Sequence, residues 1–178
     1  MIKIIHFYVL SMILVFITIG CATKGIIPKE DKSDLQERVE FSLPIPEGWK
    51  LTEWPGYKYE VLLGPNNENS ASNIIFSDGS FKGSLEMYVD YYVEQLFLLH
   101  DDNFSLARQS DFETQNKQKG IKLICHKLVH GIQYYQEIYF FDLIQERQFF
   151  ITCTTIKEIK DYDKEIFDRI IGKLILKW

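Results

Sequence analysis

The chain has 178 residues, a formal net charge of −5 and a hydrophobic fraction of 46%. This composition can bury a sizeable core, so the chain as a whole is not disordered. An acidic chain without a basic stripe is a poor match for nucleic acid, which excludes nucleic acid as an expected partner. Acidic surfaces are not attracted to anionic headgroups either, so attachment to a bilayer would need a covalent or apolar anchor.

Residues 1–20, MIKIIHFYVLSMILVFITIG, have the layout of a secretory signal peptide. Lys3 gives a short basic start, and an apolar run follows from Ile4 to Ile19. This run is shorter than the roughly 20 residues that a membrane-spanning helix needs. A basic start, an apolar run and a small residue at the cut predict a signal peptide.

The sequence Thr18-Ile19-Gly20-Cys21 resembles a bacterial lipobox. Gly20 and Cys21 match the usual pattern, whereas Thr18 stands where leucine is usual and Ile19 is bulkier than the typical residue. In such lipoproteins the thiol receives a diacylglycerol group and the chain is cut before the cysteine. The resemblance implies an exported protein that is anchored in the lipid bilayer through acylated Cys21. Two or three acyl chains anchor a protein stably in a bilayer. The alternative is an uncleaved anchor helix that ends in Gly-Cys.

Residues 21–37 are polar apart from a short apolar stretch, and they include Gly25 and Pro28. We interpret them as the lipidated cysteine and a flexible tether. The predicted domain then occupies residues 38–178.

The start of the domain has the pattern of short strands. Apolar residues alternate with polar ones from Val39 to Leu43, and Pro44 stops the run. An Asp78-Gly79 turn is expected to end the third strand. The strands predicted in this part are 39–43, 57–63 and 73–77.

Two segments have the spacing of amphipathic helices. The first begins after Ser84, which can cap it, and ends at His100. Its apolar residues recur at spacings of three and four residues, which predicts one buried stripe along the helix: Leu85, Tyr88, Val89, Tyr92, Val93, Leu96 and Leu99. The second helix is expected from about Tyr162, with this apolar face: Ile166, Phe167, Ile170, Ile171, Leu174 and Ile175.

Strands dominate between the two helices. His130-Gly131 predicts a tight hairpin turn. The predicted strands are 104–113, 121–129, 132–143 and 148–155. Consecutive hairpin-linked strands form an antiparallel sheet, so the predicted class is α+β, with about six or seven strands and helices packed on them.

Several motifs, taken in order, resemble PsbP-like domains, which are related to the DcrB-type bacterial lipoproteins. They are an opening "FSLPIPEGW", a helix "LEMYVDYYVEQL", the hairpin "GIKLICHKLVHGIQYYQEIYFFDLIQERQFFITCTT" and a strand ending in T-x-T before the last helix. The resemblance covers roughly residues 38 to 177. It implies an α/β/α sandwich around an antiparallel sheet, and a binding or accessory module that is not an enzyme.

Two cysteines, Cys125 and Cys153, lie within the predicted domain. The turn at 130–131 pairs Cys125 with about Gln136, and the turn near 144–145 pairs Cys153 with about the same residue. The strand between them separates the thiols by two strand spacings, roughly 10 Å. A disulfide needs Cα atoms within about 7 Å, so we expect two buried thiols and no disulfide.

The sequence has no nucleophile elbow, phosphate-binding loop, zinc-protease motif or Cys-x-x-Cys. His126 and His130 would lie about 13 Å apart along one strand, too far to share a metal ion. We therefore expect no catalytic residue, no metal site and no cofactor.

Aromatic side chains are the best candidates for an interface. Tyr134 points to one face of its predicted strand, and Tyr135 and Tyr139 point to the other. Two helix-covered faces would bury most of them, whereas a partly open face would let the tyrosines bind a protein or ligand. Trp49 and Trp54, near a proline-rich turn, are further candidates, with local packing as the alternative.

These observations favour a membrane-tethered, exported lipoprotein that binds an unidentified protein partner in the cell envelope. It would lie on the periplasmic side of either membrane or at the cell surface. One alternative is a carrier or sensor of a small apolar ligand, held between sheet and helix. Another is a hydrolase whose site has no recognisable motif.

Overall fold

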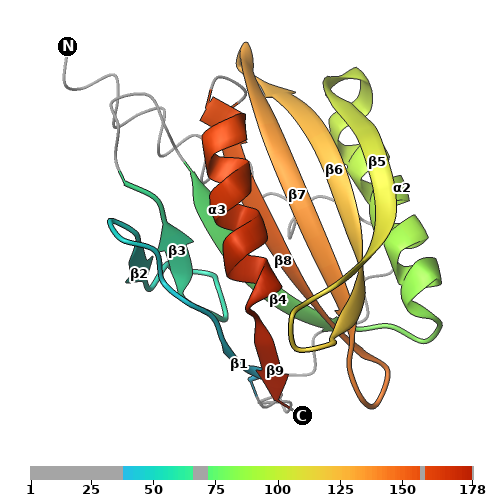
Figure 1. Cartoon of the computed structure of the whole chain (residues 1–178). Helices are drawn as coiled ribbons and strands as arrows, with labels where there is room; N and C mark the ends of the chain where they lie inside the picture. Colours follow the sequence, from blue (N-terminus) through green and yellow to red (C-terminus); the bar gives the residue numbers. More distant parts are fainter. Residues whose placement is uncertain (1–37, 66–71, 157–158, 178) are drawn as a thin grey trace. The chain divides into compact units, whose positions relative to one another are not determined.

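The structure is a computed structural model of the chain, and it describes residues 38–65, 72–156 and 159–177 (Figure 1). The chain divides into two units, residues 1–37 and residues 38–178. All described residues belong to the second unit. The predicted signal peptide, Cys21 and the tether lie outside the described residues.

The second unit contains two α-helices among its described residues, and neither is long and apolar enough to cross a membrane. The elements in chain order are β1 (Glu40–Ser42), β2 (Lys50–Thr52), β3 (Val61–Leu63), β4 (Asn73–Ser80), α2 (Leu85–His100), the short 3-10 helix η2 (Asp101–Asn103), β5 (Phe104–Glu113), β6 (Lys119–Val129), β7 (Ile132–Asp142), β8 (Arg147–Ile156), α3 (Lys160–Gly172) and β9 (Ile175–Lys177).

Seven of the strands form one antiparallel sheet in the order β2-β3-β4-β8-β7-β6-β5. Helix α3 lies on one face of this sheet and α2 on the other (Figure 1). The predicted class, an antiparallel sheet of six or seven strands with helices packed on it, is confirmed.

The central strands are apolar on both faces because their side chains alternate. Tyr139 and Phe141 of β7 belong to the core beneath α3, while Ile138 and Phe140 of the same strand belong to the core beneath α2. Alternate residues of a strand point to opposite faces. A sheet with this pattern is stable in water only when both faces are covered.

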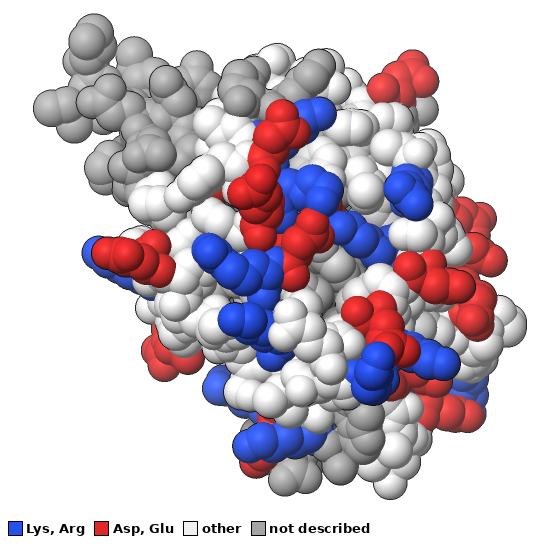
Figure 2. Space-filling view, in the orientation of Figure 1, with Lys and Arg blue, Asp and Glu red and all other residues white. Residues whose placement is uncertain are grey.

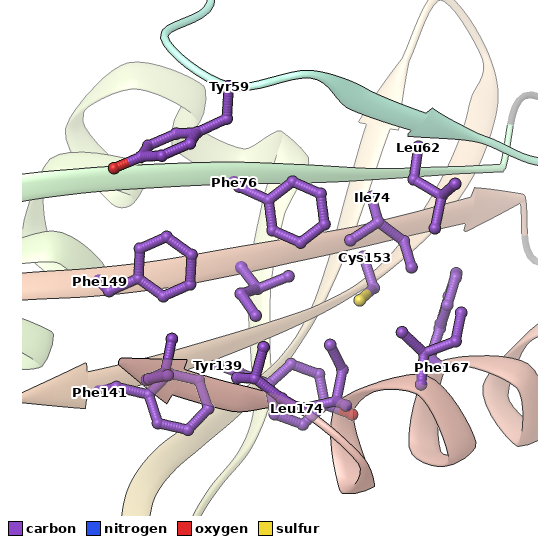
Figure 3. Close-up of a cluster of buried hydrophobic side chains, with 14 of the residues drawn as sticks. Tyr59, Leu62, Ile74, Phe76, Tyr139, Phe141, Phe149, Cys153, Phe167 and Leu174 are labelled. Atoms are coloured by element: carbon purple, nitrogen blue, oxygen red, sulfur yellow. The ribbon is translucent and has the colours of Figure 1, made fainter. Parts of the chain in front are cut away.

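The core beneath α3 is rich in aromatic rings (Figure 3). Phe76 of β4 lies 6.5 Å from Phe149 of β8, centroid to centroid, and its ring is nearly parallel to it. Phe167 of α3 is fully buried, and its ring centroid lies 6.2 Å from that of Trp49 in an edge-to-face arrangement. Such aromatic pairs add to the large apolar area that each ring removes from water.

The predicted hairpin between β6 and β7 is confirmed. His130 and Gly131 both have positive φ, 50° and 81°, as a two-residue hairpin turn of this hand requires. The turn fixes the register, so Cys125 lies opposite Gln136 as predicted. Cys153 lies opposite Glu137, one residue from the predicted position.

The cap of α2 also follows the prediction, because the Ser84 hydroxyl accepts the Met87 backbone N–H at 3.3 Å. Three other boundaries were wrong. Strand β3 begins at Val61, whereas the predicted strand began at residue 57. Strand β4 continues through Asp78-Gly79 to Ser80, since these residues pair with β8 as far as Arg147.

The third wrong boundary is at the end of α3. The helix ends at Gly172, so Leu174 and Ile175, both predicted on its apolar face, lie beyond it, and Ile175 belongs to β9. The backbone N–H groups of Lys173 and Leu174 bond three residues back and tighten the last turn. The chain then extends, and Leu176 pairs with Phe41 of β1. Strands β2 and β9, both of three residues, were not predicted.

We predict that Phe167→Ala lowers the free energy of unfolding by about 3–5 kcal/mol, because it leaves a cavity in the core beneath α3. Urea unfolding followed by circular dichroism measures this. Tyr162→Ala on the same helix is the matched control, since that side chain is 66% exposed and should change stability by less than about 1 kcal/mol. Equal losses in the two variants would contradict the predicted packing.

Candidate functional site

The aromatic residues predicted as an interface lie mostly in the interior. Tyr134, Tyr135 and Tyr139 are all buried, on the two faces that the sequence assigned to them. Trp49 is buried beside α3, and Trp54 is partly exposed with its ring 6.1 Å from Tyr57. Among the described residues they do not form a shared surface.

Two of the tyrosines bind a buried carboxylate, Glu137, which is wholly inaccessible to solvent. Tyr135 donates its hydroxyl proton to Oε1 at 2.6 Å, and Tyr139 donates to Oε2. Burial first, and then the nearby negative charge, raise the pKa of both phenols above the ordinary value. Both therefore stay protonated and serve as hydrogen-bond donors.

A lysine compensates the charge of this carboxylate. Lys122 Nζ on β6 lies 2.9 Å from Glu137 Oε2 and 3.1 Å from Asp168 Oδ1 on α3. Lys164, one turn earlier on α3, also bonds Asp168. Burial alone would raise the pKa of Asp168, but the hydrogen bonds and charges of the two lysines outweigh it and hold the pKa below its usual range.

This polar network joins β6, β7 and α3. Both carboxylate oxygens of Glu137 accept hydrogen bonds or pair with charged groups of the protein itself. A buried charge with one partner removed is strongly destabilising, whereas a complete network fixes the position of the helix on the sheet. We infer that this network holds α3 on the sheet.

Two more buried carboxylates also join distant parts of the chain. Asp78 bonds Lys58, Tyr59 and Arg147, and the Tyr59 hydroxyl also accepts the Val39 backbone N–H at 2.9 Å. The hydroxyls of Ser72 and Thr155 both donate to Asp163 Oδ2 in the first turns of α3.

The two cysteines of the domain lie on opposite faces of the sheet and are fully buried and free. Burial raises the pKa of the Cys125 thiol to about 12, and it also raises that of Cys153. Buried thiols with a raised pKa stay protonated and are poor nucleophiles. Within the described ranges, no group of three or more His, Cys, Asp or Glu side chains is arranged to hold a metal ion.

Helix α2 presents a different surface, which we call its outer face. Met87, Tyr91 and Leu98 lie at spacings of four and seven, on one side of the helix, and are 57%, 50% and 72% exposed. Phe97 and Leu99, each 45% exposed, flank them. Leu99 was predicted in the buried stripe.

The outer side of α3 is the opposite in character. Apart from the exposed Tyr162, its outward residues are charged with both signs: Asp161, Glu165, Asp168 and Arg169 are exposed and Lys164 is partly exposed. Figure 2 shows acidic and basic side chains close together on this side of the domain. Such a mixed surface is usual for a helix that faces water. The apolar outer face of α2 is therefore the candidate functional site.

The outer face of α2 was not predicted, although the sequence contains a signal for it. The segment Leu96-Phe97-Leu98-Leu99 is apolar at four successive positions, which no single face of a helix can bury. Only the inward side, centred on the fully buried Val89, packs against the sheet.

Comparison with solved structures finds the same fold at low sequence identity. CyanoP, the PsbP protein of the cyanobacterium Synechocystis, matches 77% of this chain and 86% of its own, with a TM-score of 0.58 and 11% identity. LpqN of Mycobacterium tuberculosis, involved in cell envelope biogenesis, matches 79% and 85%, with a TM-score of 0.60 and 12% identity. The Ran-binding protein Mog1p of Saccharomyces cerevisiae matches 76% and 89%, with a TM-score of 0.52 and 11% identity.

These matches define the class of protein by its fold: the domain has a PsbP-like α/β/α architecture, as the sequence motifs predicted. Identities this low show the fold alone. No protein-family model matches the chain, and no curated protein matches it.

We predict that Glu137→Gln lowers the free energy of unfolding by about 3 kcal/mol, because it leaves the half-buried Lys122 without its full charge partner. Chemical denaturation measures the loss. The control is Glu165→Gln, an exposed carboxylate on α3, which should cost less than about 0.5 kcal/mol. A Glu137→Gln variant as stable as this control would show that the network does not hold α3.

A second prediction concerns pH. Burial alone would raise the pKa of Asp78, but hydrogen bonds from Lys58, Arg147 and Tyr59 outweigh it and lower the folded-state pKa below 3.8. A lowered pKa in the folded state gives stability that is present above the unfolded-state pKa and is lost as pH falls through the folded-state pKa. The stability difference between wild type and Asp78→Asn should therefore shrink as pH is lowered from about 5 to about 3.

Urea unfolding at a series of pH values tests this. Asp111→Asn, an exposed carboxylate on β5, is the control, and its difference from wild type should stay small throughout. A difference for Asp78→Asn that is independent of pH would contradict the assignment of these hydrogen bonds to the ionised carboxylate.

Proposed function

We propose that the chain is an exported lipoprotein, tethered to a membrane through acylated Cys21, that acts as a non-enzymatic binding module in the cell envelope. The observation that carries the binding role is the outer face of α2. Five large apolar side chains of one helix are more than 40% exposed there. Large apolar side chains gathered on the exposed side of a helix are typical of an interaction site.

The polar groups of the domain support a role without catalysis. The carboxylates of Asp78, Glu137 and Asp163 are each bonded to side chains of the protein itself, and each joins separate elements. Catalytic carboxylates are usually placed in a cleft within reach of a substrate. These three instead stabilise the fold.

The location rests on the sequence. Gly20-Cys21 follows an apolar run with a basic start, and a polar stretch separates it from the domain. LpqN, which shares the fold, is involved in cell envelope biogenesis. This supports an envelope role for the present chain by analogy of fold.

The anchor predicts a clear result. In the bacterial host, wild-type chain should sediment with membranes and enter the detergent phase of a Triton X-114 separation, because buried acyl chains hold it there. Cys21→Ala should leave the precursor uncut or release the protein into the soluble fraction, with an N-terminal mass that lacks any acyl group.

Cys125→Ala serves as the control, because it removes an internal thiol and leaves the proposed lipidation site intact. It should partition like wild type. If Cys21→Ala also partitions like wild type and is cut normally, the lipoprotein proposal is wrong.

A further inference from the structure

The outer face of α2 differs in composition from the outward side of an ordinary exposed helix. The outward side of an ordinary surface helix is polar, whereas that of α2 carries exposed apolar side chains. The sheet covers the inward side of α2, where Val89 is fully buried. On the opposite side Met87, Tyr91 and Leu98 are 57%, 50% and 72% exposed, although the Tyr91 ring lies 6.0 Å from that of Phe81.

The charges of α2 are all of one sign. Glu86, Asp90 and Glu94 are exposed, and they follow one another at intervals of four along the helix. The helix contains no lysine or arginine. Like charges four apart repel one another on a helix surface, by a few tenths of a kcal/mol per pair. A cationic partner would relieve this repulsion.

Glu94 lies among the apolar residues of the outer face. It is three residues after Tyr91 and four before Leu98, so all three side chains share one side of the helix. Asp90 is three residues after Met87 and lies on the adjoining side. The face therefore consists of apolar side chains bordered by carboxylates.

This arrangement disfavours two occupants. In a two-fold contact between copies of the chain, each outer face would meet an identical face, and carboxylates would meet carboxylates. Helices that lie in a bilayer surface carry lysine and arginine beside their apolar side chains, whereas α2 has only acidic residues there.

We propose that the outer face of α2 binds a segment of another protein in which apolar side chains are flanked by lysine or arginine. The apolar side chains cover Met87, Tyr91 and Leu98, and the basic groups pair with Asp90 and Glu94. This inference rests on the proposed binding function and adds the chemistry of the partner. It does not depend on the lipid anchor.

The test is photocrosslinking of the full chain in its native host. p-Benzoylphenylalanine is placed at Leu98 or, as a matched control, at Tyr162, an equally accessible residue on α3. Crosslinked peptides are identified by mass spectrometry. We expect at least fivefold more product from Leu98 than from Tyr162, joined to a segment of another protein that contains lysine or arginine near the crosslinked residue.

Charge reversal makes the test specific. With the crosslinker at Leu98, the additional change Glu94→Lys should reduce the yield about tenfold, and Glu94→Gln should reduce it less. Glu165→Lys on α3 should leave it unchanged. Glu94 is exposed, so these variants should keep the circular dichroism spectrum of the parent.

A crosslink to a second copy of the chain, to phospholipid or to a segment without basic residues would overturn the inference but keep a binding function. A crosslinking yield that Glu94→Lys does not reduce would do the same. A yield at Leu98 no higher than at Tyr162 would overturn the binding function as well. Loss of the membrane anchor is scored separately by fractionation, so the two failures are distinguishable.

Discussion

The structure depends on one constraint, a central sheet that is apolar on both faces. Ile138 and Phe140 of β7 face one way while Tyr139 and Phe141 face the other, and all four are buried. Neither face of such a sheet can remain in contact with water, so each requires a helix. The buried polar contacts follow from the same requirement, because a carboxylate placed between sheet and helix must find its partners inside the protein.

The two helices meet this requirement in different ways. Helix α3 is amphipathic in the usual sense, with an apolar inward side, a mixed charged outward side and an anchoring network through Lys122, Glu137 and Asp168. Helix α2 covers the other face of the sheet, yet it carries apolar side chains outward as well. Packing within the domain explains only the inward half of α2. We attribute the outward half to binding.

Much of this fold was predictable because the sequence signals are local. The period-two strands, the His130-Gly131 turn and the Ser84 cap are each specified by neighbouring residues. Strands β2 and β9 were not predictable, since three residues carry too little periodicity and β9 exists by pairing with a strand at the start of the domain. The network around Glu137 depends on the register of two strands and on where α3 packs. The outer face of α2 was not predicted, because the spacing of apolar residues in a helix identifies only its buried side.

The central claim is that the outer face of α2 is covered in the cell. Hydroxyl-radical footprinting of the full chain, in intact cells and after purification, tests this most directly. In the purified chain Met87 and Tyr91 should be oxidised readily, as their exposure requires. In cells both should be protected several-fold, while Tyr162 on α3 is oxidised equally in the two states. Equal oxidation of Met87 and Tyr91 in cells and after purification would contradict the account.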